Sequence, residues 1–180
     1  MFVVSGPSGA GKGTLIAAAL VQRPDIALTV SATTRPARMG ERNGVDYHFI
    51  SMAEFLALRD RGAFLESARV YGNYYGTLRA QVEEALAAGR DVIVEVDIQG
   101  AESIKRAMPE ATLIFVEPPS LDDLAARLRG RGTEDPHALG RRIKAAYDEV
   151  KVKCTYDHVI VNDDLDRAVE SFVRILNGRT

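Results

Sequence analysis

The sequence predicts an α/β fold in which helices cover both faces of a parallel sheet. Apolar runs alternate with helix-like stretches along most of the chain, as expected when parallel strands are joined by crossover helices. The runs predicted as strands in the second half are almost entirely apolar, which is typical of strands buried on both faces. A glycine-rich segment at residues 6–14 separates the first apolar run from the first helix.

The predicted elements follow one another in a regular order at both ends of the chain. A strand at 2–5 precedes a helix at 12–22, and a second strand is expected at 27–30. No long helix is expected before residue 78, so this stretch predicts a lobe inserted into the alternation. The remaining elements are a helix at 78–88, strands at 92–96, 112–116 and 158–161, and helices at 101–107, 120–129, 136–152 and 165–176.

Polar residues at three helix starts support these assignments. Ser120 stands three residues before Asp123, and Asp164 precedes an apolar helical face, so both are expected to cap their helices. Asp135 precedes Pro136, a residue that suits the first position of a helix.

The glycine-rich segment reads Gly-Pro-Ser-Gly-Ala-Gly-Lys-Gly-Thr and matches the P-loop spacing G-x-x-x-x-G-K. Its backbone N–H groups, the start of the next helix and Lys12 can together bind a polyphosphate. Gly13 stands where the pattern has Ser or Thr, so no direct hydroxyl ligand for Mg²⁺ is expected, and Thr14 would act through water. A plain glycine turn is the alternative, but the coincidence of strand, lysine and helix favours phosphate binding.

A second polar segment carries three arginines, Arg35, Arg38 and Arg42, in the inserted lobe. Arginine forks suit a second phosphate, to which Tyr47 can donate a phenolic hydrogen bond. A solvated surface loop is the alternative, since exposed arginines are common.

Composition sets the outer limits of the interpretation. The 180 residues are 46% apolar, enough for one substantial core, and the net charge of −2 predicts no overall attraction to nucleic acid or anionic membranes. Cys154 is the single cysteine, as expected in a reducing cytoplasm, and no apolar run has membrane-span length. The first strand begins almost at Met1, which leaves no room for a signal peptide. The three histidines have no spacing typical of a zinc site.

These motifs resemble those of the guanylate kinase family, the nucleoside monophosphate kinases for GMP. The resemblance covers essentially the whole chain, in the family's order, and is carried by residues 31–49, 72–77, 97–100, 130–133 and 159–164. It implies a core around a five-stranded parallel sheet, an inserted GMP-binding lobe and a mobile helical lid over ATP. The implied boundaries are 1–31, 78–126 and 150–180 for the core, 32–77 for the lobe and 127–149 for the lid.

The resemblance also implies the residues that bind GMP. The phosphate is expected among Arg35, Arg38, Tyr47 and Tyr75, and the guanine near Ser31, Glu66, Thr77 and Asp97. Guanine presents N1–H and N2–H₂ donors beside the O6 acceptor, so a carboxylate from Glu66 and a hydroxyl from Thr77 would complement it, whereas adenine would face the wrong partners.

Each of these assignments has a structural alternative. Glu66 would be ordinary as an outward-facing residue of a short strand, and Thr77 as the cap of the next helix. Tyr75 would be ordinary as a core or edge aromatic residue. Asp97 ends a buried strand, at the edge where such sheets bind ligands, and either contacts guanine or holds a Mg²⁺-bound water. Glu95 shares its face of the strand and is expected to play a supporting role.

On the ATP side, the resemblance implies contacts from the glycine-rich segment, the lid and the last strand. Arg131 and Arg142 are expected on the phosphates together with Arg127, while Arg129 and Arg141 are expected to be surface charges; an arginine-rich helix end facing water is the alternative. The ATP-binding residues implied are Gly6, Pro7, Ser8, Gly9, Ala10, Gly11, Lys12, Gly13, Thr14, Arg127 and Asn162.

The implied reaction is transfer of the γ-phosphoryl group of Mg²⁺-ATP to GMP, giving ADP and GDP in purine nucleotide metabolism and GMP recycling. Catalysis would come from positioning and charge neutralisation by Lys12, Arg35, Arg38, Arg131 and Arg142. Mg²⁺ is expected to be held mainly by phosphates and water, with Thr14 and Asp97 acting through water and no direct protein ligand. Use of dGMP and assembly into a homo-oligomer are left open.

Two other functions fit parts of the sequence. One is a kinase for another small phosphorylated acceptor, against which Glu66, Thr77 and the arginine pair argue. The other is a protein-interaction module, because guanylate-kinase-like domains serve as such in scaffold proteins. Those modules typically lack a working phosphate loop, whereas residues 6–12 are complete here.

Overall fold

The computed structural model describes residues 1–70, 72–130 and 136–178. The chain divides into two compact units, one made of Met1 with residues 25–111 and the other of residues 2–24 with the chain from 112 onward. Each unit has its own share of parallel strands. Among the described residues, no helix has the length and apolar character needed to span a membrane.

The first unit contains a parallel strand pair and a mixed four-stranded sheet. β2 (Ala27–Leu28) pairs in parallel with β7 (Val92–Glu95). The four-stranded sheet has the order β4-β3-β6-β5, in which only the β3–β4 pair is parallel. Its strands are β3 (Ala32–Thr33), β4 (His48–Phe49), β5 (Phe64–Val70) and β6 (Asn73–Leu78), and the unit's helices are α2 (Met52–Asp60), α3 (Arg79–Ala87) and α4 (Ile98–Ala107).

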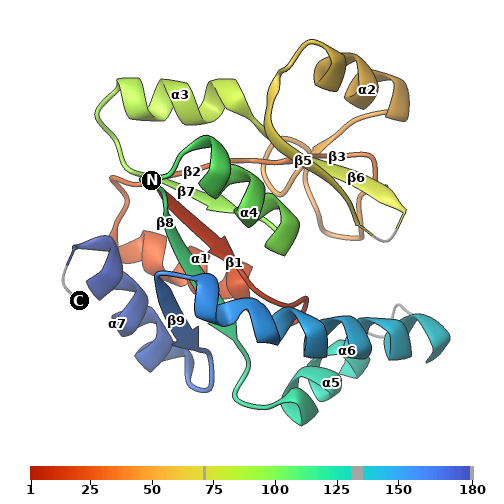
Figure 1. The fold of residues 1–180 in the computed structure, drawn as a ribbon, viewed down its shortest axis with the longest axis vertical. Helices are drawn as coiled ribbons and strands as arrows, with labels where there is room; N and C mark the ends of the chain where they lie inside the picture. Colours follow the sequence, from red (N-terminus) through yellow and green to blue (C-terminus); the bar gives the residue numbers. More distant parts are fainter. Residues whose placement is uncertain (71, 131–135, 179–180) are drawn as a thin grey trace. The chain divides into compact units, whose positions relative to one another are not determined.

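The core of the four-stranded sheet lies under α2 (Figure 1). Phe55 of α2 is fully buried and stacks on Phe64 of β5, with ring centroids 4.5 Å apart. Ala32 and Tyr74 pack against the same cluster. This packing fixes β5 and β6, the two strands that carry Glu66, Tyr75 and Thr77.

The second unit is built on three parallel strands. β1 (Phe2–Ser5) pairs with β8 (Thr112–Glu117), and β8 pairs with β9 (His158–Val161). In Figure 1, α7 (Leu165–Leu176) lies beside α1 (Lys12–Gln22) and β9. The other helices are α5 (Leu121–Gly130), α6 (Pro136–Lys151) and the 3₁₀ turn η1 (Val152–Thr155). Parallel strands joined by helices are thus present in both units, so the α/β class with parallel strands is confirmed.

Two capping predictions are also confirmed. Asp123 N donates to Ser120 Oγ at 3.0 Å, and Arg167 N donates to the Asp164 carboxylate at 3.0 Å. The predicted cap at Asp135 lies outside the described residues.

Several predicted boundaries are wrong, each for a local reason. The strand expected at 27–30 ends at Leu28, and the helix expected from 101 begins at Ile98 because Asp97 caps it. The inserted lobe contains a nine-residue helix, α2, that was not predicted. Its start carries a capping box, in which Ser51 and Glu54 satisfy each other's backbone N–H groups.

Candidate functional site

In the second unit, the glycine-rich loop joins the end of β1 to the start of α1. Gly6, Gly9 and Gly11 all have positive φ, of 139°, 94° and 89°. Leu15 N makes the first helical hydrogen bond, to Gly11 O at 3.0 Å, so the N–H groups before it have no acceptor within the helix. Within the described helix α1, the first turn carries no acidic residue. The positive end of the helix is thus available to an anion.

Steric crowding is a second reason for glycine at positions 6 and 11. A methyl group on Gly6 would lie 2.1 Å from the carbonyl oxygen of Val116 in β8. One on Gly11 would lie 2.4 Å from Asn162 Nδ2. A side chain at position 6 would therefore collide with backbone, and one at position 11 would displace the Asn162 amide in addition to requiring a positive φ.

Two residues predicted to bind ATP, Asn162 and Arg127, form hydrogen bonds that stabilise this loop. Asn162 is buried, and its Nδ2 donates to Ala10 O at 2.7 Å. Arg127 donates to Asn162 O at 3.0 Å and to Ala10 O at 3.4 Å. Both side chains thus act on the carbonyl of Ala10, a role that the sequence did not indicate.

Lys12 is the first residue of α1, and its ammonium group folds back over the loop. Nζ donates to Gly6 O at 2.7 Å and to Pro7 O at 3.1 Å. Thr14 and Gly13 are exposed on the same turn. The lysine is therefore held at the loop by the residues whose amides would face a phosphate.

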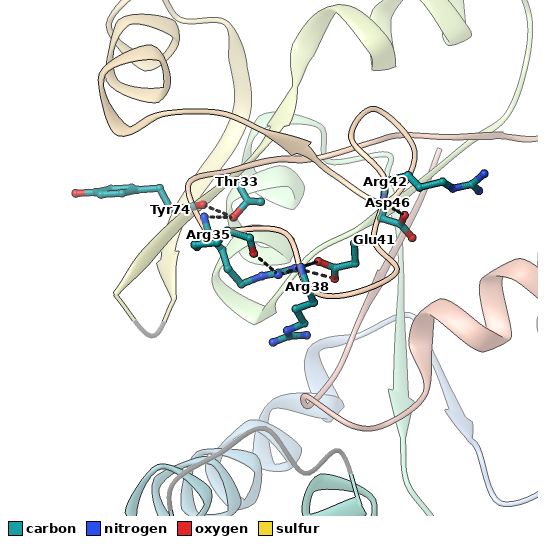
Figure 2. Close-up of polar contacts among 8 residues, drawn as sticks. Thr33, Arg35, Arg38, Glu41, Arg42, Asp46 and Tyr74 are labelled. Atoms are coloured by element: carbon teal, nitrogen blue, oxygen red, sulfur yellow. Dashed lines mark hydrogen bonds and ion pairs between the residues drawn. The ribbon is translucent and has the colours of Figure 1, made fainter.

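In the first unit, Arg35 makes a forked ion pair with Glu41 (Figure 2). Arg35 NH1 donates to Glu41 Oε2 and NH2 donates to Glu41 Oε1, both at 2.9 Å. Glu41 Oε2 also accepts from Arg38 N at 2.7 Å. This hydrogen bonding raises the pKa of Arg35 and holds the pKa of Glu41 below its usual value. Glu41, which was not predicted as a site residue, therefore orients the Arg35 guanidinium and holds the backbone at Arg38.

The Arg38 side chain is exposed and extends away from the Arg35–Glu41 pair in Figure 2. Arg42, by contrast, is part of a turn in which its backbone N–H donates to Asp46 Oδ2 at 2.7 Å. The structure thus gives Arg35 and Arg38 a shared partner and leaves Arg42 outside that group.

Tyr47 and Tyr75 lie beside Arg35. The Tyr47 and Tyr75 rings meet edge to face, with centroids 6.0 Å apart, and the Arg35 guanidinium lies 5.4 Å from the Tyr47 ring centroid. Burial, and next the charge of Glu95, raise the pKa of the Tyr47 phenol to about 12, so it remains a hydrogen-bond donor at neutral pH. Two phenols and the Arg35 guanidinium are thereby gathered at one side of the lobe.

Glu66 and Thr77 face each other across the β5–β6 pair. Glu66 is 8% exposed, and its Oε1 accepts from Thr77 N at 3.0 Å and from Thr77 Oγ1 at 2.9 Å. Oε2 accepts no hydrogen bond within the described part of the chain. Burial, with a further contribution from the charge of Asp97, raises the Glu66 pKa to about 7. The site therefore holds a carboxylate that lacks a donor for one of its oxygens.

Thr77 does not cap the next helix, because α3 begins at Arg79 after the N-cap Leu78. Its hydroxyl also does not have the predicted direction toward a guanine O6, since its proton is donated to Glu66. Thr77 is fully buried, and its observed role is to orient the carboxylate. A hydrogen bond to guanine O6 would therefore require either a different donor group or release of the Thr77 hydroxyl from Glu66.

Asp97 and Ser31 complete the predicted guanine site. Asp97 Oδ1 accepts from Gly100 N at 2.7 Å, which caps α4, so one of its two oxygens serves the fold. A methyl group on Gly100 would lie 2.9 Å from Glu66 Oε2, so this glycine leaves room for the carboxylate. Ser31 is half-buried and precedes β3. Both residues are in the unit that holds Glu66.

Arg131 and the side chain of Arg142, predicted on the ATP phosphates, lie outside the described residues. In the described ranges, Arg129 is exposed, and no group of three or more His, Cys, Asp or Glu side chains could hold a metal ion. A protein-built metal cage is thus not found in those ranges.

The strand, the loop of left-handed glycines with its lysine, and the helix that follows place the protein among the P-loop phosphate-binding α/β proteins. The sequence model of the guanylate kinase family, described as "Guanylate kinase", matches residues 1–179. The chain belongs to the guanylate kinase family.

Individual relatives agree with this assignment. The guanylate kinase of Aromatoleum aromaticum is 45% identical over 178 residues, covering 99% of this chain and 87% of that protein. That of Neisseria gonorrhoeae is 48% identical over 178 residues, with the same coverage of 99% and 87%. The crystal structure of guanylate kinase from Anaplasma phagocytophilum matches with a TM-score of 0.83 and 34% identity, covering 99% of this chain and 84% of that one.

Proposed function

We propose that the protein transfers the γ-phosphoryl group of ATP to the phosphate of GMP. An oxygen of the GMP phosphate forms a bond to the γ-phosphorus, the bond from that phosphorus to the β,γ-bridging oxygen breaks, and ADP leaves with GDP as the second product. Family membership over the whole chain supports this activity. The buried carboxylate of Glu66, with one oxygen held by Thr77 and the other without a donor, is the observation that carries the choice of guanine.

The donor nucleotide would bind at the glycine loop. The N–H groups at the start of α1, which have no acceptor within the helix, and the positive end of that helix favour its phosphates. Lys12 would exchange its bonds to Gly6 O and Pro7 O for phosphate oxygens, which neutralises charge as the β,γ bond breaks. Asn162 and Arg127 support this binding through Ala10 O, because they hold the loop open toward the phosphates.

The acceptor phosphate would bind to Arg35, Arg38, Tyr47 and Tyr75. Arginine carries five N–H groups, and Arg35 commits three of them to Glu41 and Pro36. The guanidinium is therefore oriented before GMP arrives, which lowers the entropy cost of binding. The acceptor oxygen is already anionic, so no general base is required.

Guanine would donate N1–H and N2–H₂ to the Glu66 carboxylate. These donors supply the hydrogen bonds that Oε2 lacks, so binding favours the ionised form of a group whose pKa is raised to about 7. AMP has an acceptor at N1 and would leave the carboxylate unpaired in a buried site. Discrimination of that kind reaches about 10⁴-fold.

Mg²⁺ would enter with the ATP phosphates and stabilise the charge on the departing bridge oxygen. Thr14 and Asp97 are the residues proposed to contact its water. We further propose a cytoplasmic enzyme that acts without nucleic acid or membrane partners. In this proposal the core, the GMP-binding lobe and the lid have the boundaries given above, with 127–149 as the lid.

The test is an ADP-release assay with ATP, Mg²⁺ and each nucleoside monophosphate in turn. We expect turnover with GMP, and turnover with AMP, CMP and UMP lower by orders of magnitude. ADP release with a different acceptor would support the rival kinase function. Absence of ATP binding would support a protein-interaction module instead.

A further inference from the structure

Gln81 of α3 makes a pair of hydrogen bonds with the backbone of Val30. Val30 N donates to Gln81 Oε1 at 2.8 Å, and Gln81 Nε2 donates to Val30 O at 3.1 Å. Val30 lies between the end of β2 and the start of β3, so neither of these backbone groups belongs to a strand ladder. The side-chain amide takes the place of a neighbouring strand and satisfies both.

The same amide reaches His48 of β4. Because Val30 N–H fixes the position of the amide oxygen, the group 3.1 Å from His48 Nε2 is the amide nitrogen. The amide nitrogen is a donor, so His48 Nε2 is the acceptor in this contact. His48 N in turn donates to Ser31 O at 2.9 Å. Ser31 is thus held between two residues, Val30 and His48, that Gln81 links to each other.

The hydrogen bonds of Gln81 to Val30 and His48, here called the Gln81 clamp, hold the segment that leads directly into β3 and from there to the strands that carry Glu66. Ala32, which follows Ser31, pairs with Gly76 in β6, and the next residue of β6, Thr77, pairs with Glu66. The position of Ser31 along β3 therefore decides how it lies relative to the carboxylate. A slip of the segment before β3 would change that alignment.

We infer that Gln81 is a positioning residue for the purine end of the acceptor site, acting through Val30 and His48 on Ser31. The inference rests on the function proposed above. Gln81 acts indirectly, because both hydrogens of Nε2 are committed to Val30 O and His48. The amide retains no hydrogen for a nucleotide. Because Ser31 belongs to the proposed acceptor site, a change at Gln81 should affect binding of the acceptor nucleotide and not of ATP.

The test is Gln81→Met, which keeps the length of the side chain and removes all three hydrogen bonds. Gln22→Met is the matched control, since Gln22 is exposed at the end of α1. Calorimetric binding to wild type and both variants should show the dissociation constant for GMP rising about tenfold in Gln81→Met only, with that for ATP within about twofold. The Val30 amide should also exchange its hydrogen faster in this variant. Unchanged GMP affinity, or equal loss for GMP and ATP, would overturn the inference.

Gln81→Glu keeps the test informative if the methionine variant does not fold. The carboxylate still accepts from Val30 N–H but cannot donate to Val30 O or to His48. GMP affinity should again fall while ATP affinity holds, and full GMP affinity in this variant would contradict the clamp. A wild-type protein that binds no GMP would refute the proposed function, an outcome distinct from normal wild-type binding with unaffected Gln81 variants.

Discussion

Glu66 is a buried carboxylate without a cation beside it in the described part of the chain, and its pKa is raised to about 7. Ionising it at neutral pH costs the free protein stability, since its only hydrogen-bond donors come from Thr77. The cost is recovered when a ligand supplies further donors. A residue that strains the empty protein in this way is typical of a binding site.

The raised pKa of Glu66 is expected to make the unfolding free energy of the protein depend on pH. The native pKa of Glu66 is raised above its usual value of 4.5, so its protonated form is favoured by folding. Wild type should be most stable relative to Glu66→Gln below about pH 4.5, and should lose about 3 kcal/mol of that difference as pH rises through 7. Urea unfolding of both proteins without nucleotide, at pH 5 and pH 8, measures this change.

Glu41→Gln is the contrasting control for that experiment. The pKa of Glu41 is lowered, chiefly by its hydrogen bonds from Arg35, so its stabilisation is lost only in more acidic solution. The difference between wild type and Glu41→Gln should therefore hardly change between pH 5 and pH 8. A Glu66 difference that is equally independent of pH would contradict the assigned environment.

Lys12 is expected to matter for turnover and little for folding. Its ammonium group makes two hydrogen bonds to Gly6 O and Pro7 O at a partly buried site. Lys12→Ala should lower kcat with GMP at least about a hundredfold, because charge developing on the transferred phosphoryl group loses its cation. Its unfolding free energy should change by only about 1 kcal/mol. A near-normal rate in this variant would refute the role.

At the scale of single residues, sequence motifs were enough to select Lys12, Arg35 and Glu66 as candidate site residues. They could not find Glu41 or Gln81. A glutamate in a polar loop and a glutamine on a helix are ordinary in sequence, and their importance comes from partners that only the fold brings near. Asp97 was found, but its capping of α4 depends on a helix start three residues earlier than predicted.

The loop between β1 and α1 depends on glycine for two separate reasons, backbone conformation and space. Gly11→Ala combines a φ of 89° with a contact 2.4 Å from Asn162 Nδ2. Gly89→Ala combines a φ of 69° with open space. The difference between the two variants isolates the close approach of Asn162 to the loop.

We expect Gly89→Ala to cost about 1 kcal/mol of stability and to leave ATP binding unchanged. Gly11→Ala should cost more and weaken ATP binding at least about tenfold, because Asn162 must release Ala10 O. Thermal unfolding and ATP titration of the two variants check this. Equal effects of both substitutions on ATP binding would contradict the clamp of the loop by Asn162.

Regular elements were predictable where the pattern was long or buried, as in α1, β8 and α7. Short elements of the lobe were not, because β3 and β4 have two residues each and depend on pairing with distant segments, β3 with β6 and β4 with β3. The strand predicted at 27–30 ends early because the side chain of Gln81 occupies the backbone of Val30. Helix α2 was missed although its capping box is visible in the sequence at Ser51 and Glu54.

At the scale of the molecule, we propose two anion-binding arrangements of different chemistry. One, in the second unit, consists of main-chain amides, a helix start and Lys12. The other, in the first unit, consists of guanidinium and phenol groups beside a buried carboxylate. A phosphotransferase with two nucleotide substrates needs both. The net charge of −2 gives the protein no overall attraction for anions, so binding of two nucleotides would depend on locally arranged positive groups.

The central claim is that the first unit selects guanine through Glu66. Calorimetric titration of wild type and Glu66→Gln with GMP and with ATP, at pH 8, tests it most directly. We predict that the dissociation constant for GMP rises at least about a hundredfold in Glu66→Gln, while that for ATP changes less than about twofold. Equal loss of both affinities, or undiminished GMP binding, would contradict the claim.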